Sequence, residues 1–155
     1  MLMRVVHRTA LVPQTPTQMY ALVNDVRRYP EFLPWCPVTV VHAEDATSLS
    51  ATLTFERVGV RSAVTTTNAN VPDERIEMVL TEGPLKSFKG VWQFHALRSR
   101  TTDGSLGELK GCKVELTVEF AFRNAALDLV FGPFFEATWD SIVDAFVKRA
   151  RVVHP

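Results

Sequence analysis

The central part of the chain alternates between apolar and polar residues. Between residues 38 and 122, apolar side chains recur at every second position in several runs, which turn-forming residues separate. This period is typical of strands that bury one face, as in an antiparallel sheet with its other face in water. The pattern therefore predicts strand after strand over this region. The clearest run places these apolar residues on one face: Cys112, Val114, Leu116, Val118, Phe120 and Phe122.

Shorter runs of the same kind lie upstream, and a weaker alternation predicts a further strand over residues 3–12. The residues expected to face the core are Leu49, Ala51, Leu53 and Phe55, then Ile76, Met78 and Leu80, then Trp92 and Phe94. Turns are expected at Val58-Gly59 and Pro72-Asp73, at Gly83-Pro84, and in a hairpin loop from Asp103 to Gly111.

A first helix is predicted to begin at Thr15. Thr15 and Gln18 have the spacing of a capping box, and Pro16 suits the first helical position. Prolines at positions 30, 34 and 37 then interrupt regular structure. One face of this helix is apolar and consists of Met19, Leu22, Val23 and Val26.

Residues 124–153 have the period of a long amphipathic helix. At 100° per residue, an apolar stripe is formed by Phe131, Phe135, Ile142, Phe146 and Val153, with Trp139 at its edge. The opposite side carries Glu136, Asp140, Asp144 and Lys148. This separation predicts a helix that packs on the sheet.

A break in this helix is expected at Gly132-Pro133. Pro133 has no amide hydrogen to donate, and its ring crowds the carbonyl of Leu129. A straight helix of thirty residues would also measure about 45 Å, which is longer than a small domain is wide. We therefore expect a short first piece and a long second piece that starts near Pro133.

Composition limits the class of protein. The chain has 155 residues, of which 46% are hydrophobic and 22% charged, as in an ordinary globular protein, and a single domain over residues 1–155 is expected. Lysine plus arginine equal aspartate plus glutamate at 17 each, so no global positive field attracts nucleic acid. Cys36 and Cys112 have no closely spaced partner and are expected to be free thiols in a reducing compartment.

No targeting, membrane or catalytic signature is evident. The chain from Met1 to Arg4 has no apolar run of signal-peptide length, and the long helix carries too many acids to span a bilayer, so a cytoplasmic protein is expected. The sequence has no phosphate-binding glycine loop and no nucleophile elbow. The four histidines, which lack metal-ligand spacing, are His7, His42, His95 and His154.

Three acidic residues are candidate acid/base groups. Glu115 and Glu119 lie on the polar face of their strand and are expected to be solvated, and Asp25 is expected to cap or turn the chain locally. The segment Gly104 to Gly107 is expected to be a plain hairpin loop.

Three motifs resemble one known family. Residues 26–36 (VRRYPEFLPWC), 83–94 (GPLKSFKGVWQF) and 145–150 (AFVKRA) are similar to signatures of the coenzyme Q-binding START-domain family. That family includes bacterial ribosome-association toxins and sits in the polyketide cyclase/dehydrase superfamily. The resemblance covers residues 3–153 in order, and the tail from residue 152 to 155 departs from the family's pattern.

The resemblance implies an α+β helix-grip (START-like) fold, in which a long C-terminal helix closes a curved antiparallel sheet. It implies a non-enzymatic carrier or chaperone for a hydrophobic small molecule, such as the polyprenyl quinone ubiquinone, that supports respiration. No other cofactor, metal or DNA partner is expected, and transient contact with the inner membrane would fit a lipid carrier. The alternative is a ribosome-association toxin that binds the large ribosomal subunit and hinders subunit joining. A cyclase or dehydrase rests on superfamily analogy alone.

The predicted ligand cavity is aromatic. Its bulky side chains either fill a core or hold the helix and sheet apart, and the sequence leaves both interpretations open. The segment from Tyr29 to Trp35 either caps this core or forms an apolar lip at a cavity mouth. The candidate residues are Phe32, Trp35, Phe55, Met78, Leu80, Trp92, Phe94, Phe120, Phe131, Phe135, Trp139, Ile142 and Arg149.

Charged residues bear on the two partners. Arg149 falls within the apolar stripe, so either it reaches water and the last carbonyls at the helix end, or it contacts a ligand head or a buried carboxylate. The acids of the exposed stripe would repel RNA, so a ribosome-binding surface needs bases elsewhere. The candidate pairs are Arg27 with Arg28, and Lys86 with Lys89.

Overall fold

A computed structural model describes residues 2–155, so Met1, the first residue of the predicted domain, lies outside it. That residues 1–155 form one domain stays a prediction. The elements are β1 (Arg4–Val12), α1 (Pro16–Asn24), the 3-10 helix η1 (Val26–Glu31), β2 (Thr39–Asp45), β3 (Ser48–Arg57), β4 (Val60–Val71), β5 (Arg75–Glu82), β6 (Leu85–Arg100), β7 (Leu106–Phe122) and α2 (Ala125–Val153).

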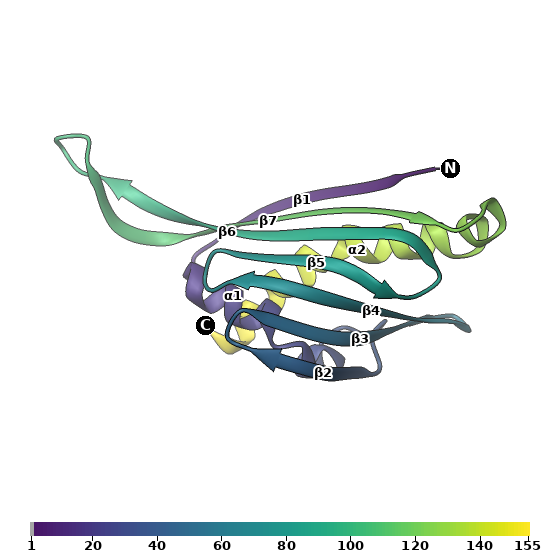
Figure 1. The fold of residues 1–155 in the computed structure, drawn as a ribbon. Helices are drawn as coiled ribbons and strands as arrows, with labels where there is room; N and C mark the ends of the chain where they lie inside the picture. Colours follow the sequence, from purple (N-terminus) through teal and green to yellow (C-terminus); the bar gives the residue numbers. More distant parts are fainter. Residues whose placement is uncertain (1) are drawn as a thin grey trace.

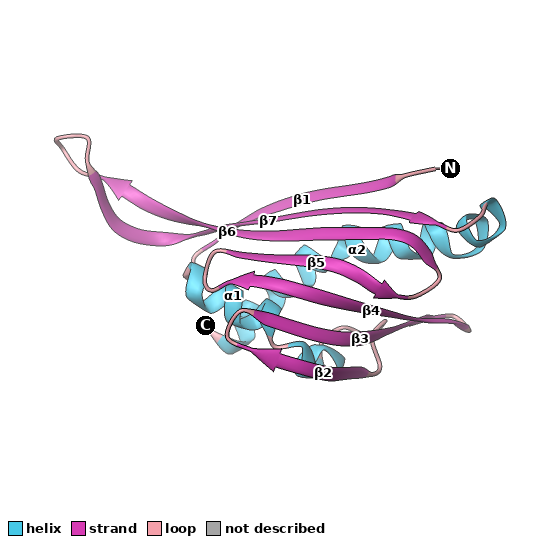
Figure 2. Ribbon diagram, in the orientation of Figure 1, coloured by secondary structure: helices cyan, strands magenta, loops and turns pink. Residues whose placement is uncertain are grey.

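The seven strands form one antiparallel sheet in the order β1-β7-β6-β5-β4-β3-β2. Figure 1 shows α2 running across one face of this sheet, with α1 and η1 near its C-terminal end. Figure 2 shows the same two layers coloured by secondary structure. The predicted α+β helix-grip architecture is confirmed, because the inward faces of the alternating strands and the apolar face of α2 share one core.

The predicted capping box at the start of α1 is present. The Thr15 hydroxyl accepts from the amide of Gln18 at 3.1 Å, and the amide of Thr15 donates to the Gln18 side chain at 2.9 Å. Asp25 caps the C-terminus of α1, as expected, and its carboxylate pairs with Arg28 at 3.2 Å. Cys36 and Cys112 are buried and free.

The expected break in α2 is wrong, because the helix is continuous from Ala125 to Val153 with Pro133 inside it. Pro133 and Leu129 lie on the exposed side of the helix. A carbonyl that loses its helical donor there can turn to water, so one missing hydrogen bond bends a helix without ending it. Val153 is also not part of the buried face, since 42% of its surface is exposed.

Side chains from β1 hold the first turns of α2 against the sheet. Arg4 donates to both carboxylate oxygens of Asp128, at 2.9 and 3.0 Å, and to Glu136 at 3.4 Å. Gly132 makes room for this guanidinium, because a Cβ at that position would lie 2.6 Å from two of its nitrogens. Asn124 caps the helix by accepting from the amide of Leu127 at 2.9 Å.

Two hairpins extend beyond the packed layers. The β3–β4 turn consists of Val58 and Gly59, which both have positive φ angles, at 47° and 79°. The hairpin of β6 and β7 is longer and projects away from the body, at the upper left of Figure 1. Its turn contains Gly104 with φ of 85°, so a hairpin loop is present, but the expected extent to Gly111 is wrong, because β7 already begins at Leu106. Among residues 2–155, no helix is long and apolar enough to cross a membrane.

Candidate functional site

The interior between α2 and the sheet is built from packed aromatic rings. From α2, Phe135 and Trp139 contact Phe55 of β3, with ring centroids 4.7 and 6.1 Å apart. Phe146, further along the helix, meets Trp92 of β6 edge to face at 5.4 Å. Each of these five side chains has an exposed fraction of 3% or less. The helix periodicity predicted this face, and the rings fill most of the space beneath the helix.

The predicted site residues divide into three groups. Residues of the tightly packed core are Phe55, Phe94, Phe120 and Phe135. Residues that are only partly buried are Phe32, Trp35, Leu80, Phe131 and Arg149. The remaining four line one internal cavity: Met78, Trp92, Trp139 and Ile142.

This cavity is small. Its volume is about 20 Å³, whereas drug-sized ligands occupy pockets of roughly 300–1,000 Å³. It is large enough for about one water molecule. In this conformation the interior therefore accommodates no intact lipid, and a larger ligand would have to displace side chains.

One wall of the cavity is polar. Thr66 and Asn68 project inward from β4, and the Thr66 hydroxyl donates to Asn68 Oδ1 at 2.9 Å. Trp139 Nε1 is buried and has no hydrogen-bond acceptor within the described residues. A buried donor without a partner costs free energy, so this N–H is a ready donor for an oxygen of a bound molecule.

Sequence reasoning missed this polar wall. Positions 66, 68 and 70 carry polar residues on the same face of β4 as the buried Val64. Residues two apart in a strand lie on the same face, so the apolar Val64 could have indicated that these polar residues also point inward. The cavity residues outside the prediction are Val26, Tyr29, Ala51, Leu53, Thr66 and Asn68.

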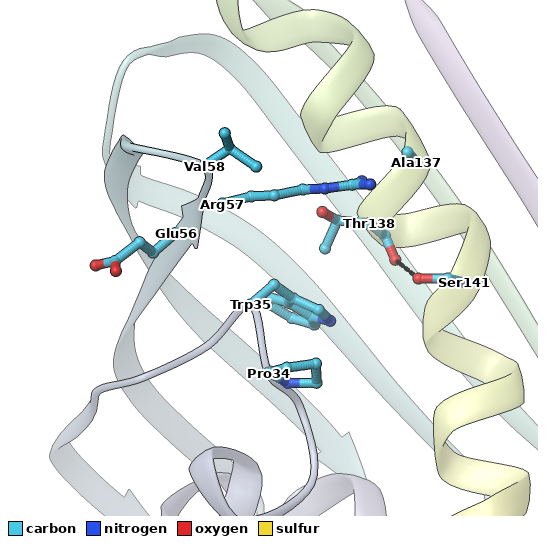
Figure 3. Close-up of a pocket in the computed structure, with 8 residues that line it drawn as sticks. All are labelled: Pro34, Trp35, Glu56, Arg57, Val58, Ala137, Thr138 and Ser141. Carbon is cyan, nitrogen blue, oxygen red and sulfur yellow. Dashed lines mark hydrogen bonds between the residues drawn. The ribbon is translucent and has the colours of Figure 1, made fainter.

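An outer groove of about 530 Å³ lies on the surface near this interior. Figure 3 shows Pro34 and Trp35 on one side of it, the β3–β4 turn above, and α2 with Thr138 and Ser141 opposite. Trp35 stacks on Phe55, with centroids 4.9 Å apart and planes at 13°. Trp35 thus lines the groove and packs on the core, whereas a role of the segment from Tyr29 to Trp35 as the lip of a ligand cavity stays a prediction.

Arg149 lies outside the internal cavity. Its guanidinium donates to Glu31 at 2.8 Å and stands 5.0 Å from the centre of the Phe32 ring. Glu31 is about half exposed, so its carboxylate is not a buried one. Arg149 borders two surface grooves of about 500 and 430 Å³. Its contacts with Glu31 and Phe32 connect the end of η1 to α2.

Burial changes the acidity of groups close to the cavity. It raises the pKa of the Tyr29 phenol well above its usual range, and the phenol donates to the carbonyl of Val23. Burial likewise raises the pKa of Cys36 to about 11. Both groups therefore stay neutral at physiological pH and serve the core as uncharged side chains.

The outer face of the sheet joins three residues that are far apart in sequence. Glu115 of β7 bonds His7 of β1 at 2.8 Å and His95 of β6 at 3.0 Å. Glu115 is therefore only partly solvated, contrary to the expectation, while Glu119 is exposed as expected. Hydrogen bonds from His7 and then His95 lower the pKa of Glu115. Within residues 2–155 no group of histidine, cysteine and acidic side chains has the arrangement of a metal site.

Comparison with known protein families matches residues 12–147 to the family described as polyketide cyclase / dehydrase and lipid transport. The chain belongs to this family. Within it, the chain is 38% identical to the ribosome association toxin RatA of Pseudomonas aeruginosa over 96% of both proteins. It is 37% identical to RatA of Vibrio cholerae, covering 98% of this chain and 99% of the relative. The resemblance stated from the motifs is thereby confirmed.

More distant similarities include one curated protein sequence and two solved structures with the same fold. The mitochondrial coenzyme Q-binding protein COQ10 of Drosophila melanogaster is 24% identical over 91% of this chain, which spans 56% of that protein. A crystal structure from Thermus thermophilus superposes with a TM-score of 0.78 at 15% identity, over 98% of this chain and all of the other. The Zhui aromatase/cyclase of a Streptomyces species superposes with a TM-score of 0.77 at 17% identity, over 97% of this chain and 94% of the other.

Proposed function

We propose that this family member associates with the large ribosomal subunit and hinders subunit joining. The observation that carries the proposal is the identity of 37–38% with ribosome association toxins over almost the entire length of both chains. This likeness outweighs the 24% identity with the coenzyme Q-binding relative, so the alternative raised by the sequence has more support than the quinone carrier. An aromatase/cyclase activity has only the fold in its favour.

The packing of the interior is consistent with this proposal. A cavity of about 20 Å³ gives a polyprenyl chain no room in this conformation. A protein that acts through its outer surface needs no such room. A rigid aromatic core would then serve to hold the surface elements in place.

Ion pairs change the electrostatic picture of that surface. Asp140 and Asp144 of α2 face Arg8 of β1 at 3.5 and 3.6 Å, so the acidic stripe is partly neutralised. Arg27 pairs with Glu44 at 2.9 Å, and Arg28 pairs with two acids, which removes the first candidate basic pair. Lys86 and Lys89 are exposed and form no ion pair among the described residues.

Co-sedimentation with purified large ribosomal subunits across a salt series tests the proposal. Binding at low salt that weakens steeply as salt rises is expected, because contacts to phosphates release counterions. A parallel assay should show fewer joined ribosomes when the protein is added before the small subunit. Absence of co-sedimentation at the lowest salt would refute the proposal.

A second candidate function is the binding of a hydrophobic small molecule that carries an acceptor oxygen, such as ubiquinone. The observation in its favour is Trp139, which lines the cavity together with Asn68 and whose buried Nε1 has no acceptor among the described residues. A quinone carbonyl would satisfy this donor. Entry would require Trp35 to leave its stack on Phe55, since the outer groove and the core meet there.

Organic extraction of the purified protein, followed by quinone analysis, tests this second function. Addition of a short-chain ubiquinone should raise the unfolding midpoint of the wild type, because a ligand of the folded state stabilises it. Trp139→Phe keeps an aromatic ring without the donor and should lose most of that rise. If no lipid co-purifies and the quinone shifts neither protein, the carrier function is excluded.

A further inference from the structure

The hairpin of β6 and β7 continues well beyond the sheet that supports it. The last pairing of β6 with β5 is Gln93 with Arg75, and the outermost pairing of β7 with β1 is Cys112 with Val12. Residues 96–111, which we name the ribbon, pair along their strands with each other and, at Ala96, with Cys112. We name the rest of the molecule the body. The five β6 residues of the ribbon, 96–100, correspond to a reach of about 17 Å beyond the body, and Figure 1 shows the ribbon standing clear of α2.

The ribbon contributes nothing to the core. No residue from 96 to 110 is buried. A two-stranded hairpin on its own is marginally stable in water, so its conformational entropy is not offset by packing within this chain. An element of this kind gains its stabilisation from whatever it contacts outside the chain.

The charges of the ribbon indicate what that partner is. Arg98 and Arg100 are exposed, and their guanidinium groups donate only to ribbon carbonyls, Gly107 at 3.4 Å and Gly104 at 3.0 Å. Neither has a carboxylate within ion-pair distance among the described residues. Of the ten arginines outside the ribbon, seven pair with carboxylates within residues 2–155, and Arg57, Arg123 and Arg151 do not; the seven are Arg4, Arg8, Arg27, Arg28, Arg61, Arg75 and Arg149.

The acids of the ribbon are already engaged. Asp103 accepts hydrogen bonds from Thr101 and from the amide and hydroxyl of Ser105, which close the turn. Glu108 pairs with Lys110 at 3.3 Å. The two arginines are thus the ribbon's uncompensated charges, and their planar, forked donors match phosphate oxygens.

We propose that the ribbon contacts RNA of the large ribosomal subunit and that Arg98 and Arg100 bind its backbone phosphates. This inference rests on the proposed association with the ribosome and adds the surface that makes it. Structured RNA is recognised mainly through its shape and its phosphate and sugar groups, and a narrow projecting ribbon of about 17 Å can reach along a groove or between helices.

Two double variants with equal loss of charge separate the ribbon from the body. Arg98→Ala with Arg100→Ala should weaken co-sedimentation with large subunits about tenfold or more. It should also reduce the slope of the logarithm of the binding constant against the logarithm of the salt concentration by about 2, since each phosphate contact contributes roughly one unit. Arg61→Ala with Arg75→Ala removes the same charge from exposed arginines outside the ribbon, which pair with Glu56 and Glu77, and should leave both quantities close to wild type.

A third variant checks that the effect belongs to the guanidinium groups. Arg98→Lys with Arg100→Lys keeps the charge without the fork, and should retain the salt slope while losing part of the affinity. All three variants should fold, which circular dichroism and thermal unfolding verify, because the substituted side chains lie outside the core.

The remaining outcomes decide against the ribbon. Unchanged affinity and slope in Arg98→Ala with Arg100→Ala would overturn the inference while leaving ribosome association intact. Equal losses in Arg61→Ala with Arg75→Ala would do the same, since the effect would then be one of net charge. Weaker binding at an unchanged salt slope would indicate contact with a ribosomal protein and would overturn the assignment to RNA. If the wild type does not co-sediment, the proposed function itself fails.

Discussion

Single residues in this protein are placed where their local preferences would not put them. Val58 has φ of 47°, in the left-handed region that favours glycine and asparagine, and 94% of its surface is exposed. This conformation costs a β-branched residue about 1–2 kcal/mol, and Val58 recovers little of it through contacts. Its side chain borders the outer groove.

Val58→Asn should raise the free energy of unfolding by about 1 kcal/mol, because asparagine tolerates the left-handed turn and no buried contact is lost. Urea denaturation followed by tryptophan fluorescence measures the change. Val79→Asn is the matched control: Val79 is an exposed valine in the ordinary strand β5, and its replacement should bring no gain. A loss of stability in Val58→Asn would show that the turn is not strained.

The two thiols should be inert in the folded protein. Burial raises the pKa of both Cys36 and Cys112 to about 11, and neither has measurable exposure. At pH 8 almost no thiolate is present, so a disulfide reagent such as Ellman's should react very slowly with the native protein. Once guanidinium unfolds the chain, the reagent should react with both thiols. Rapid reaction of the native protein would contradict the burial of these residues.

Glu115 should contribute to acid sensitivity. Its pKa in the folded state is lowered from an ordinary value near 4.5 by hydrogen bonds from His7 and His95. A group of this kind stabilises the fold above its unfolded pKa, and the stabilisation is lost as pH falls through the lowered folded value. Glu115→Gln should therefore flatten the decline in stability below about pH 4.5, measured by urea unfolding at several pH values. If the free energy of unfolding of Glu115→Gln declines at low pH as steeply as that of the wild type, this role is excluded. Glu119→Gln serves as the exposed control.

At the scale of elements, one ion-pair cluster fixes how α2 sits on the sheet. Arg4 reaches across Gly132 to Asp128 and Glu136, so a strand residue and two helix acids depend on the absence of a side chain between them. The continuity of α2 through Pro133 belongs to the same scale. Its first turns are held by this cluster and by the stacking of Phe131 on Phe122, at 6.3 Å, which compensates for a missing backbone hydrogen bond.

Gly132→Ala should have opposite effects in two backgrounds. With Arg4 replaced by alanine, the substitution should stabilise the helix by about 1 kcal/mol, as alanine does relative to glycine. With Arg4 present, the new Cβ would displace the guanidinium, and the gain should be cancelled or reversed. A double-mutant cycle by denaturant unfolding measures this coupling. Additive effects would show that Arg4 does not lie over Gly132.

At the scale of the whole molecule, the body and the ribbon are energetically separate. The core lies between α2 and the seven strands, and residues 96–110 of the ribbon add no buried side chain to it. The molecule therefore consists of an aromatic interior, closed in this conformation, and surface elements that the interior holds in position.

Replacement of residues 98–110 by Asn-Gly should leave the fold intact. The shortened hairpin keeps the pairing of Leu97 with Gly111 and should close with a two-residue turn. The thermal midpoint should fall by no more than a few degrees, since no core contact is removed. A large loss of cooperativity in thermal unfolding would show that the ribbon supports the body.

The sequence by itself determined the elements, because the periods of two and 3.6 residues are local consequences of strand and helix geometry. The strands, the capping box at Thr15, the buried face of α2 and the family resemblance all follow from residues close together in the chain. Four of the thirteen predicted site residues line the cavity for the same reason, since each lies on a correctly assigned inward face.

Only the tertiary structure decided how much space remains inside, because a volume depends on how rings from distant elements interdigitate. It also decided which charges are compensated. Glu115 meets histidines from two other strands, Arg149 meets Glu31, and Arg98 and Arg100 meet no carboxylate among residues 2–155. Pairings between residues far apart in sequence leave no periodic trace, so strand register and helix docking had to place them.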